Sequence, residues 1–188
     1  LTDMALGQRV ILRYGGEDTD RHGRVLAQMF VLRDGGEVWA QHEMVARGMA
    51  RVYSFPDNRA CLATLLSAEG TARTMKLGIW DVPEYEVRRA DRPQALAERE
   101  GHYELVEGRV LLADQGGGGD VYLNFGRVWK EDFTVLIDAR SLRLFTDAGL
   151  DPMRLEGALV RVRGWVDMRA GPRIEVTHPE QVEVLATR

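Results

Sequence analysis

The chain has 188 residues, and its 45% hydrophobic and 29% charged content is ordinary for a globular protein of one large or two small domains. No apolar run is long enough to span a bilayer, which excludes a membrane helix, and the single cysteine, Cys61, excludes an intrachain disulfide. The formal net charge of −4 gives no overall field that attracts polyanions, so binding to nucleic acid would have to come from local arginine clusters.

The first half of the chain alternates strand-like and helix-like patterns and ends near Trp80. Apolar residues alternate with polar ones in its strand segments and recur at helical spacing in its helical ones. Glycines follow the expected helices, where they are suited to ending them. Prolines and charges beyond Trp80 indicate a connector. The expected elements are strands over 9–14 and 25–32, helices over 38–47 and 62–77, and a linker over 83–100.

The second half has a different order of elements. The expected elements are strands over 103–113, 121–125, 133–138, 159–168 and 174–176, with a short helix over 139–148. A helix between the third and fourth of five strands is typical of an OB-type barrel. The glycine run 116–119 lacks the ending of a phosphate-binding loop and lies between two strands, so we interpret it as a hairpin tip.

The segment from Asp20 to Ala27 is the most informative motif. It places Arg21, His22 and Arg24 on a turn between two strand-like runs. Guanidinium groups are planar, always charged and suited to holding a phosphate. The alternative is a solvated hairpin loop in which a glycine supplies a positive φ. The segment alone does not decide between these interpretations.

The first half resembles the staphylococcal nuclease (thermonuclease) family. The matching blocks occur in the family's order: Gly7–Val10, Asp20–Ala27, Met44–Val52, Glu69–Arg73 and Lys76–Trp80. The resemblance implies an α+β, mostly β fold: a partial nuclease-like OB barrel with helices, followed by a second, five-stranded OB-like barrel. We expect the nuclease-like domain at 1–82, the linker at 83–100 and the OB-like domain at 101–188.

The resemblance also implies a role for particular residues in metal-assisted hydrolysis of phosphodiester bonds in DNA or RNA. Arg24 matches the family's arginine that contacts the scissile phosphate, where it would stabilise developing negative charge. Arg21 and His22 match positions beside the bound nucleotide. Tyr53 and Phe55 match aromatic positions that stack on the base, with packing of their turn as the alternative.

The chain departs from the family pattern at the metal site. The family carries its calcium-binding aspartates, its general base and a second arginine on D-G-D-T-like and D-x-P-E-like segments upstream of the block that opens this chain. The resemblance implies Ca²⁺ as cofactor, but the sequence identifies no metal ligands. We therefore expect little or no nuclease activity from this chain, since one arginine cannot also activate water.

The second half offers a further candidate surface. Tyr122 and Asn124 alternate with the apolar residues of the expected strand over 121–125, and Arg161, Arg163 and Trp165 share one face of the strand over 159–168. Guanidinium groups beside an aromatic ring suit single-stranded nucleic acid, because the former can meet phosphates and the latter a base. The alternative is an ordinary exposed strand face, which the acidic balance of this half favours.

Three hypotheses about function remain: a nuclease-family fragment, a non-catalytic nucleic-acid-binding module, and a protein-interaction module. The expected partner is single-stranded DNA or RNA, with no membrane; the oligomeric state stays open. The chain begins at Leu1 without a visible signal peptide, so a fragment or processed product is one interpretation. Members of the family are often exported, so the resemblance implies an exported protein, periplasmic or secreted, as one possibility; the sequence itself does not fix the localisation.

Overall fold

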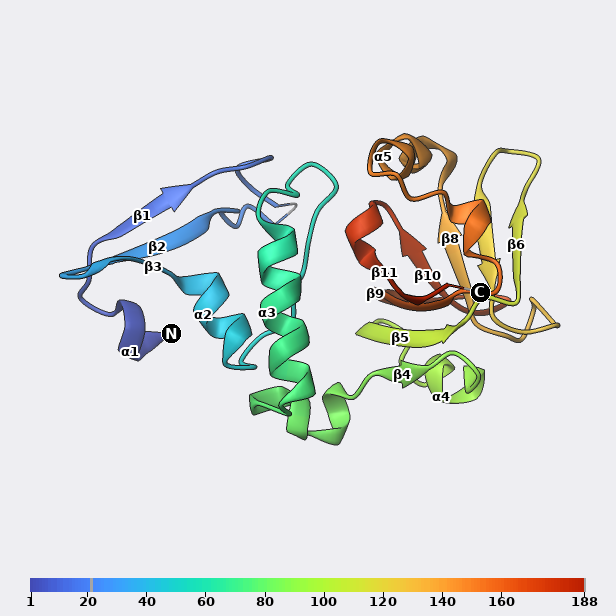
Figure 1. Cartoon of the computed structure of the whole chain (residues 1–188), viewed down its shortest axis with the longest axis horizontal. Helices are drawn as coiled ribbons and strands as arrows, with labels where there is room; N and C mark the ends of the chain where they lie inside the picture. The colour runs from blue at the N-terminus through green and yellow to red at the C-terminus, as the bar shows by residue number, and fades with distance from the viewer. Residues whose placement is uncertain (21, 188) are drawn as a thin grey trace. The chain divides into compact units, whose positions relative to one another are not determined.

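The structure is a computed structural model that describes residues 1–20 and 22–187. The chain divides into two compact units, Leu1–Tyr85 and Glu86–Arg188 (Figure 1). Each unit is mixed α+β, and each fits an OB-like architecture. The domain boundaries expected from the sequence stay a prediction.

The first unit is built on a three-stranded antiparallel sheet, β1 (Val10–Arg13), β2 (Gln28–Arg33) and β3 (Gly36–Trp39). The remaining elements are α1 (Thr2–Ala5), α2 (Ala40–Ala46), α3 (Leu62–Thr74), η1 (Gly78–Asp81) and η2 (Pro83–Tyr85). Two small apolar clusters hold them together. One joins α1 and α2 to the sheet through Met4, Val31 and Ala40, and the other joins α2 to α3.

Two expected elements of the first unit differ from the structure. The helix expected over 38–47 begins only at Ala40, because Trp39 lies in β3 opposite Phe30, stacks on its ring at 6.0 Å and donates to Gln28. The strand expected from Val25 begins at Gln28, and Val25 itself forms only an isolated bridge with Thr19. The residues between Val25 and Gln28 belong to a turn that extends the candidate site.

The second unit is a closed barrel of five strands, the first of which is bent into two segments, β5 (Tyr103–Arg109) and β6 (Leu112–Gln115). Its other strands are β7 (Val121–Asn124), β8 (Thr134–Ile137), β9 (Leu159–Arg169) and β10 (Gly171–Val176). They pair in the order β5-β9-β10-β8-β7-β6, with β8 and β10 parallel. Since β5 continues into β6 through Val110 and Leu111, the two ends of the sheet belong to one bent strand, and the sheet closes.

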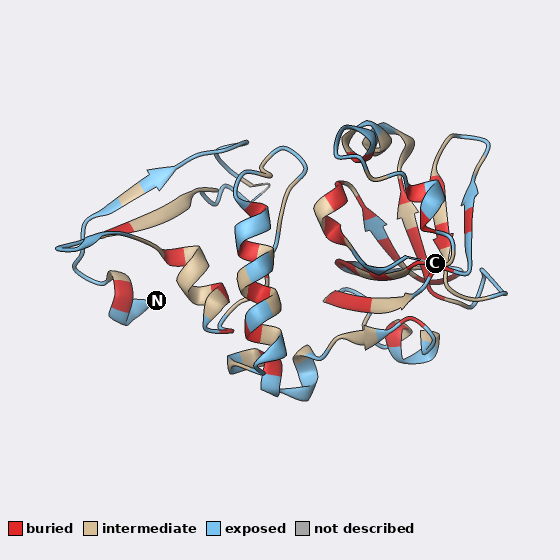
Figure 2. Ribbon diagram, viewed as in Figure 1, coloured by how far each residue is buried: buried red, intermediate tan, exposed pale blue. Residues whose placement is uncertain are grey.

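Shorter elements complete the second unit: β4 (Arg88–Arg89), α4 (Pro93–Ala97), η3 (Ala139–Ser141), α5 (Leu142–Asp147), η4 (Pro152–Leu155), η5 (Pro179–Gln181) and β11 (Val182–Ala186). α5 lies between the third and fourth barrel strands, as the sequence predicts. The segment expected as a linker contributes Ala90 and Leu96 to the barrel's single large apolar core. Figure 2 shows the buried residues of this unit concentrated on the barrel strands.

Candidate functional site

The turn that follows β1 is organised by the carboxylate of Asp20. Its Oδ1 accepts hydrogen bonds from the backbone N–H groups of His22, at 2.8 Å, and Arg24, at 2.9 Å. Gly23 has φ +73°, a conformation that favours glycine, and its N–H donates to the Asp20 carbonyl. The turn is therefore a defined loop. The predicted site residue Arg21 lies outside the described residues.

Arg24 of this turn forms an ion pair with Asp20. Its Nε lies 2.6 Å from Asp20 Oδ2, while 76% of the Arg24 side chain is exposed. The backbone N–H of Arg24, followed by the guanidinium and the N–H of His22, lowers the pKa of Asp20 from 3.8 to about 2. Both partners are thus charged at neutral pH, and the Arg24 guanidinium is open to a ligand.

The loop between α2 and α3 carries the two predicted aromatic residues. The ring centroids of Tyr53 and Phe55 are 5.1 Å apart in an edge-to-face arrangement. Tyr53 is 50% exposed, and Phe55 is half-buried. A flat aromatic surface is available here, and the exposed Tyr53 contributes most of it.

A buried carboxylate on α3 fixes the start of this loop. Glu69 is fully buried, and its Oε1 accepts from the N–H of Val52 at 2.7 Å. Its Oε2 accepts from Arg73 at 3.2 Å. The sequence shows Glu69 only as an interruption in an apolar helical stripe. An acidic residue at a core position is the signal that could have identified this anchor.

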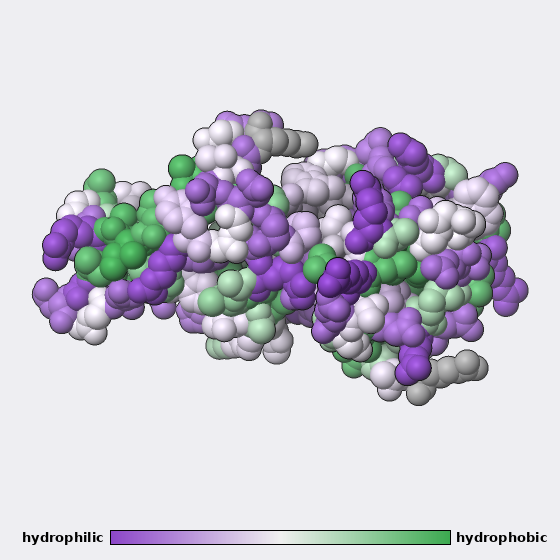
Figure 3. Space-filling view, turned by 90° about the horizontal axis from the view of Figure 1, so that it is seen from above, coloured by the Kyte–Doolittle hydropathy of each residue, from purple (hydrophilic) through white to green (hydrophobic). Residues whose placement is uncertain are grey.

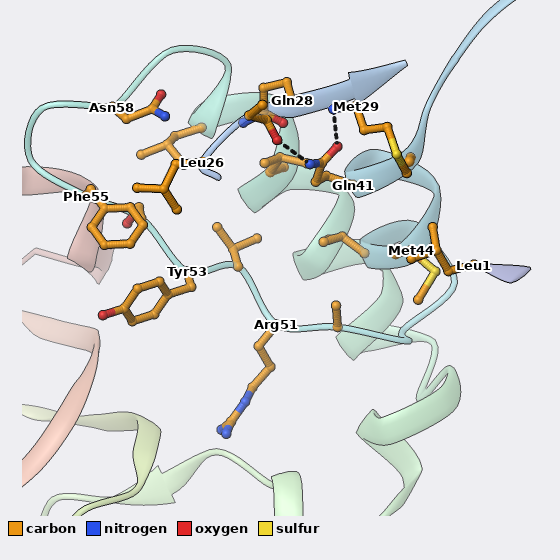
Figure 4. Close-up of a pocket in the computed structure, with 18 residues that line it drawn as sticks. Leu1, Leu26, Gln28, Met29, Gln41, Met44, Arg51, Tyr53, Phe55 and Asn58 are labelled. Carbon is orange, nitrogen blue, oxygen red and sulfur yellow. Dashed lines mark hydrogen bonds between the residues drawn. The ribbon is translucent and has the colours of Figure 1, made fainter. Parts of the chain in front are cut away.

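The Asp20 turn and the aromatic loop meet in space. Leu26 and Ala27, just beyond Arg24, line a cavity of about 380 Å³ together with Tyr53 and Phe55. Figure 4 shows the Leu26 side chain beside the Phe55 ring. Two segments almost thirty residues apart therefore form one wall.

Side-chain anchors hold both segments of this wall in place. Gln41 of α2 donates to the Ala27 carbonyl at 2.8 Å and accepts from the Met29 N–H at 3.0 Å, as the dashed lines in Figure 4 show. Asp57 accepts from the N–H of Glu17 at 2.8 Å, which ties the aromatic loop to the entry of the turn. The wall is preorganised by these bonds.

The arginines of the second-unit candidate surface are engaged with glutamates. Arg161 bonds Glu107 and Glu183, each at 2.9 Å. Arg163 is only 1% exposed and lies 2.6 Å from Glu183. Trp165 is exposed and packs edge-to-face on Tyr103 at 5.7 Å. Of the three residues, Trp165 is the one that the structure presents to a ligand.

The carboxylates of the first-unit site do not fit a calcium centre. Calcium takes six to eight oxygen ligands, mostly from carboxylates and carbonyls. Asp20 is bound to Arg24, and Asp57 to the Glu17 N–H. Among residues 1–20 and 22–187, no three His, Cys, Asp or Glu side chains lie together as a metal-binding group.

One comparison with known protein families matches the first part of the chain. The family described as staphylococcal nuclease homologue matches residues 1–82. This confirms the resemblance that the motifs predict, and the closed barrel of the second unit is compatible with the appended OB-like domain. No curated protein matches the chain. In the described part of the chain, no helix is both long and apolar enough to cross a membrane.

Proposed function

Residues 1–82 match the staphylococcal nuclease homologue family. From this premise we propose that the first unit binds single-stranded nucleic acid along the wall formed by the Asp20 turn and the aromatic loop. The family acts on nucleic acids, which supports the choice of ligand. Arg24 would hold a backbone phosphate, and Tyr53 with Phe55 would stack on a base. Arg21 and His22 are proposed beside the same nucleotide.

The observation that carries the proposal is that the segment bearing the exposed Arg24 continues into Leu26 and Ala27, which line one cavity with Tyr53 and Phe55. A guanidinium alone would favour any anion, and an aromatic pair alone would favour packing. Together they match the alternation of phosphate and base in a nucleic-acid strand. Asp20 keeps Arg24 extended until a phosphate replaces or shares its Nε contact.

We propose binding rather than hydrolysis as the activity of the described residues. Calcium is general in the family, where it would polarise the phosphate, but the carboxylates near Arg24 are engaged elsewhere and do not fit it. Clear calcium-dependent cleavage of single-stranded DNA, abolished by both a chelator and Arg24→Ala, would overturn this part of the proposal.

The binding proposal is tested by fluorescence anisotropy with a labelled oligothymidylate at low salt. Arg24→Ala removes one charge-assisted phosphate contact, so we expect affinity to fall about tenfold. Arg47→Ala is the matched control, because Arg47 also pairs with an acid four residues earlier and is similarly exposed. Equal effects of the two substitutions would contradict the assignment to Arg24.

A protein-interaction function is the second candidate, and one observation favours it. Large apolar residues are exposed on and around β1, namely Leu6, Val10, Leu12 and Tyr14. Figure 3 shows apolar side chains gathered over the end of the first unit that carries the sheet. Exposed apolar patches often mark interaction surfaces. Absence of oligonucleotide binding at low salt would favour this candidate over the first.

A further inference from the structure

The barrel of the second unit carries a groove that lies outside the family match and contains Tyr122 and Asn124 but not Arg161, Arg163 or Trp165. Its volume is about 470 Å³, and it lies over the outer face of the barrel strands. The lining combines arginines, aromatic rings and small polar side chains. Its members are Leu112, Asp114, Tyr122, Asn124, Gly126, Arg127, Trp129, Thr134, Arg169 and Arg173.

The floor of the groove is a row of cross-strand neighbours. Asn124 of β7 lies opposite Leu112 of β6 on one side and Thr134 of β8 on the other. Arg173 of β10 continues the row beside Thr134. The Thr134 hydroxyl donates to Asn124 Oδ1 at 3.1 Å. Since the strands set these spacings, the floor is rigid and its polar groups have fixed positions.

The charge of the groove is locally positive although the chain is net negative. Arg127, Arg169 and Arg173 line it, and Asp114 is the one acid among its described lining residues. Arg127 and Arg169 are exposed and form no ion pair or side-chain hydrogen bond with another described residue. Arg173 pairs with Asp167 at 2.8 Å. Two guanidinium groups are therefore available to an anionic ligand.

An ordered turn between β7 and β8 presents an aromatic ring at the groove. Trp129 is 60% exposed, and the Lys130 ammonium lies 5.4 Å from its ring centroid. Asp132 Oδ2 accepts from the Val128 N–H at 2.8 Å, and the Val128 carbonyl accepts from the Asp132 N–H at 2.9 Å. These bonds hold the turn, so the exposed ring needs little further ordering to bind a flat ligand.

We infer that this groove is a second site for single-stranded nucleic acid, separate from the Arg24 wall. Arg127 and Arg169 bind backbone phosphates, a base stacks on Trp129, and Asn124 and Thr134 offer polar groups to a base edge. A single strand is required, because bases within a duplex are stacked on one another and cannot reach the ring. An acidic peptide would use the arginines but not the stacking surface.

The inference is tested by fluorescence anisotropy in an Arg24→Ala background, which separates the groove from the first-unit site. The probe is a fluorescein-labelled oligothymidylate of about ten nucleotides, within the span of one OB barrel. The test variant is Arg127→Ala/Arg169→Ala. Its matched control is Arg143→Ala/Arg154→Ala, which removes two exposed arginines that do not line the groove.

We expect the groove variant to bind at least tenfold more weakly at low salt, with the slope of log K against log salt falling by about 1.4 for two lost phosphate contacts. Trp129→Ala should weaken binding while leaving that slope unchanged. Equal affinity of the groove and control variants would overturn the inference. So would displacement of the probe by polyglutamate as efficiently as by unlabelled oligothymidylate, because the site would then recognise acidic peptides.

Discussion

Asp20 has two roles at the candidate site. One oxygen closes the turn through backbone N–H groups, and the other orients the guanidinium of Arg24. The same carboxylate thus shapes the loop and restrains the residue proposed to bind phosphate. Alanine at this position would remove the acceptor of both N–H groups and the carboxylate that orients the Arg24 guanidinium.

The lowered pKa of Asp20 predicts how the turn responds to acid. Because the folded pKa, about 2, lies below the ordinary value of 3.8, the carboxylate's contribution to turn stability is fully present above about pH 4. It is lost as the pH falls through about 2. Carboxyl ¹³C and amide NMR titration should therefore show Asp20, His22 and Arg24 changing together near pH 2. A midpoint at 3.8 would show that the turn does not hold the carboxylate.

At the scale of elements, α3 supports the aromatic loop through Glu69. The close crossing of the chain at Gly48 and Gly78 adds to this support, since the N–H of Ile79 donates to the Gly48 carbonyl at 2.8 Å. A Cβ on Gly48 would lie 2.1 Å from the Leu77 carbonyl oxygen, so only glycine fits. The helices thereby set where the loop leaves α2 and where Tyr53 is placed.

Glu69→Ala should destabilise the first unit by about 3 kcal/mol, because it leaves the buried Val52 N–H without its acceptor and Arg73 without its carboxylate. Glu69→Gln keeps an acceptor oxygen and should cost less. Urea unfolding followed by hydrogen exchange in residues 1–85 measures the loss. Glu43→Ala is the control, since its exposed pair with Arg47 should contribute under about 1 kcal/mol. An equal cost for Glu43 and Glu69 would refute the anchoring role.

At the scale of the whole molecule, the two units differ in the size of the apolar cores that stabilise them. The second unit has a single large apolar core inside a closed barrel, whereas the first depends on two small clusters and buried polar anchors. Leu6, Val10, Leu12 and Tyr14, on and around β1 of the first unit, are also exposed. A ligand or partner that binds only the folded first unit would stabilise it by mass action, by an amount set by the ligand's concentration and affinity.

Local patterns predicted much of the fold. Alternation located β1, β7 and β9, and the helix between barrel strands indicated the OB-type order. β3 was missed because Trp39 continues the helical spacing of the residues after it, and only its pairing with Phe30 makes it a strand residue.

The candidate sites show where local patterns stop being informative. The motif located the Asp20 turn, but its contact with the aromatic loop is a tertiary feature. The strand positions of Arg161 and Arg163 suggested an exposed strip, but glutamates on β5 and β11 occupy both side chains. The groove arginines come from separate loops and strands, so no sequence pattern joins them.

The most direct measurement is amide chemical-shift mapping of the full chain with oligothymidylate, using the Arg127→Ala/Arg169→Ala variant so that the groove does not contribute. The account predicts the largest shifts in residues 22–27 and 51–58, the two segments that meet at the cavity. Shifts confined to residues beyond Glu86, or no shifts at saturating oligonucleotide, would contradict the assignment of nucleic-acid binding to the Arg24 wall.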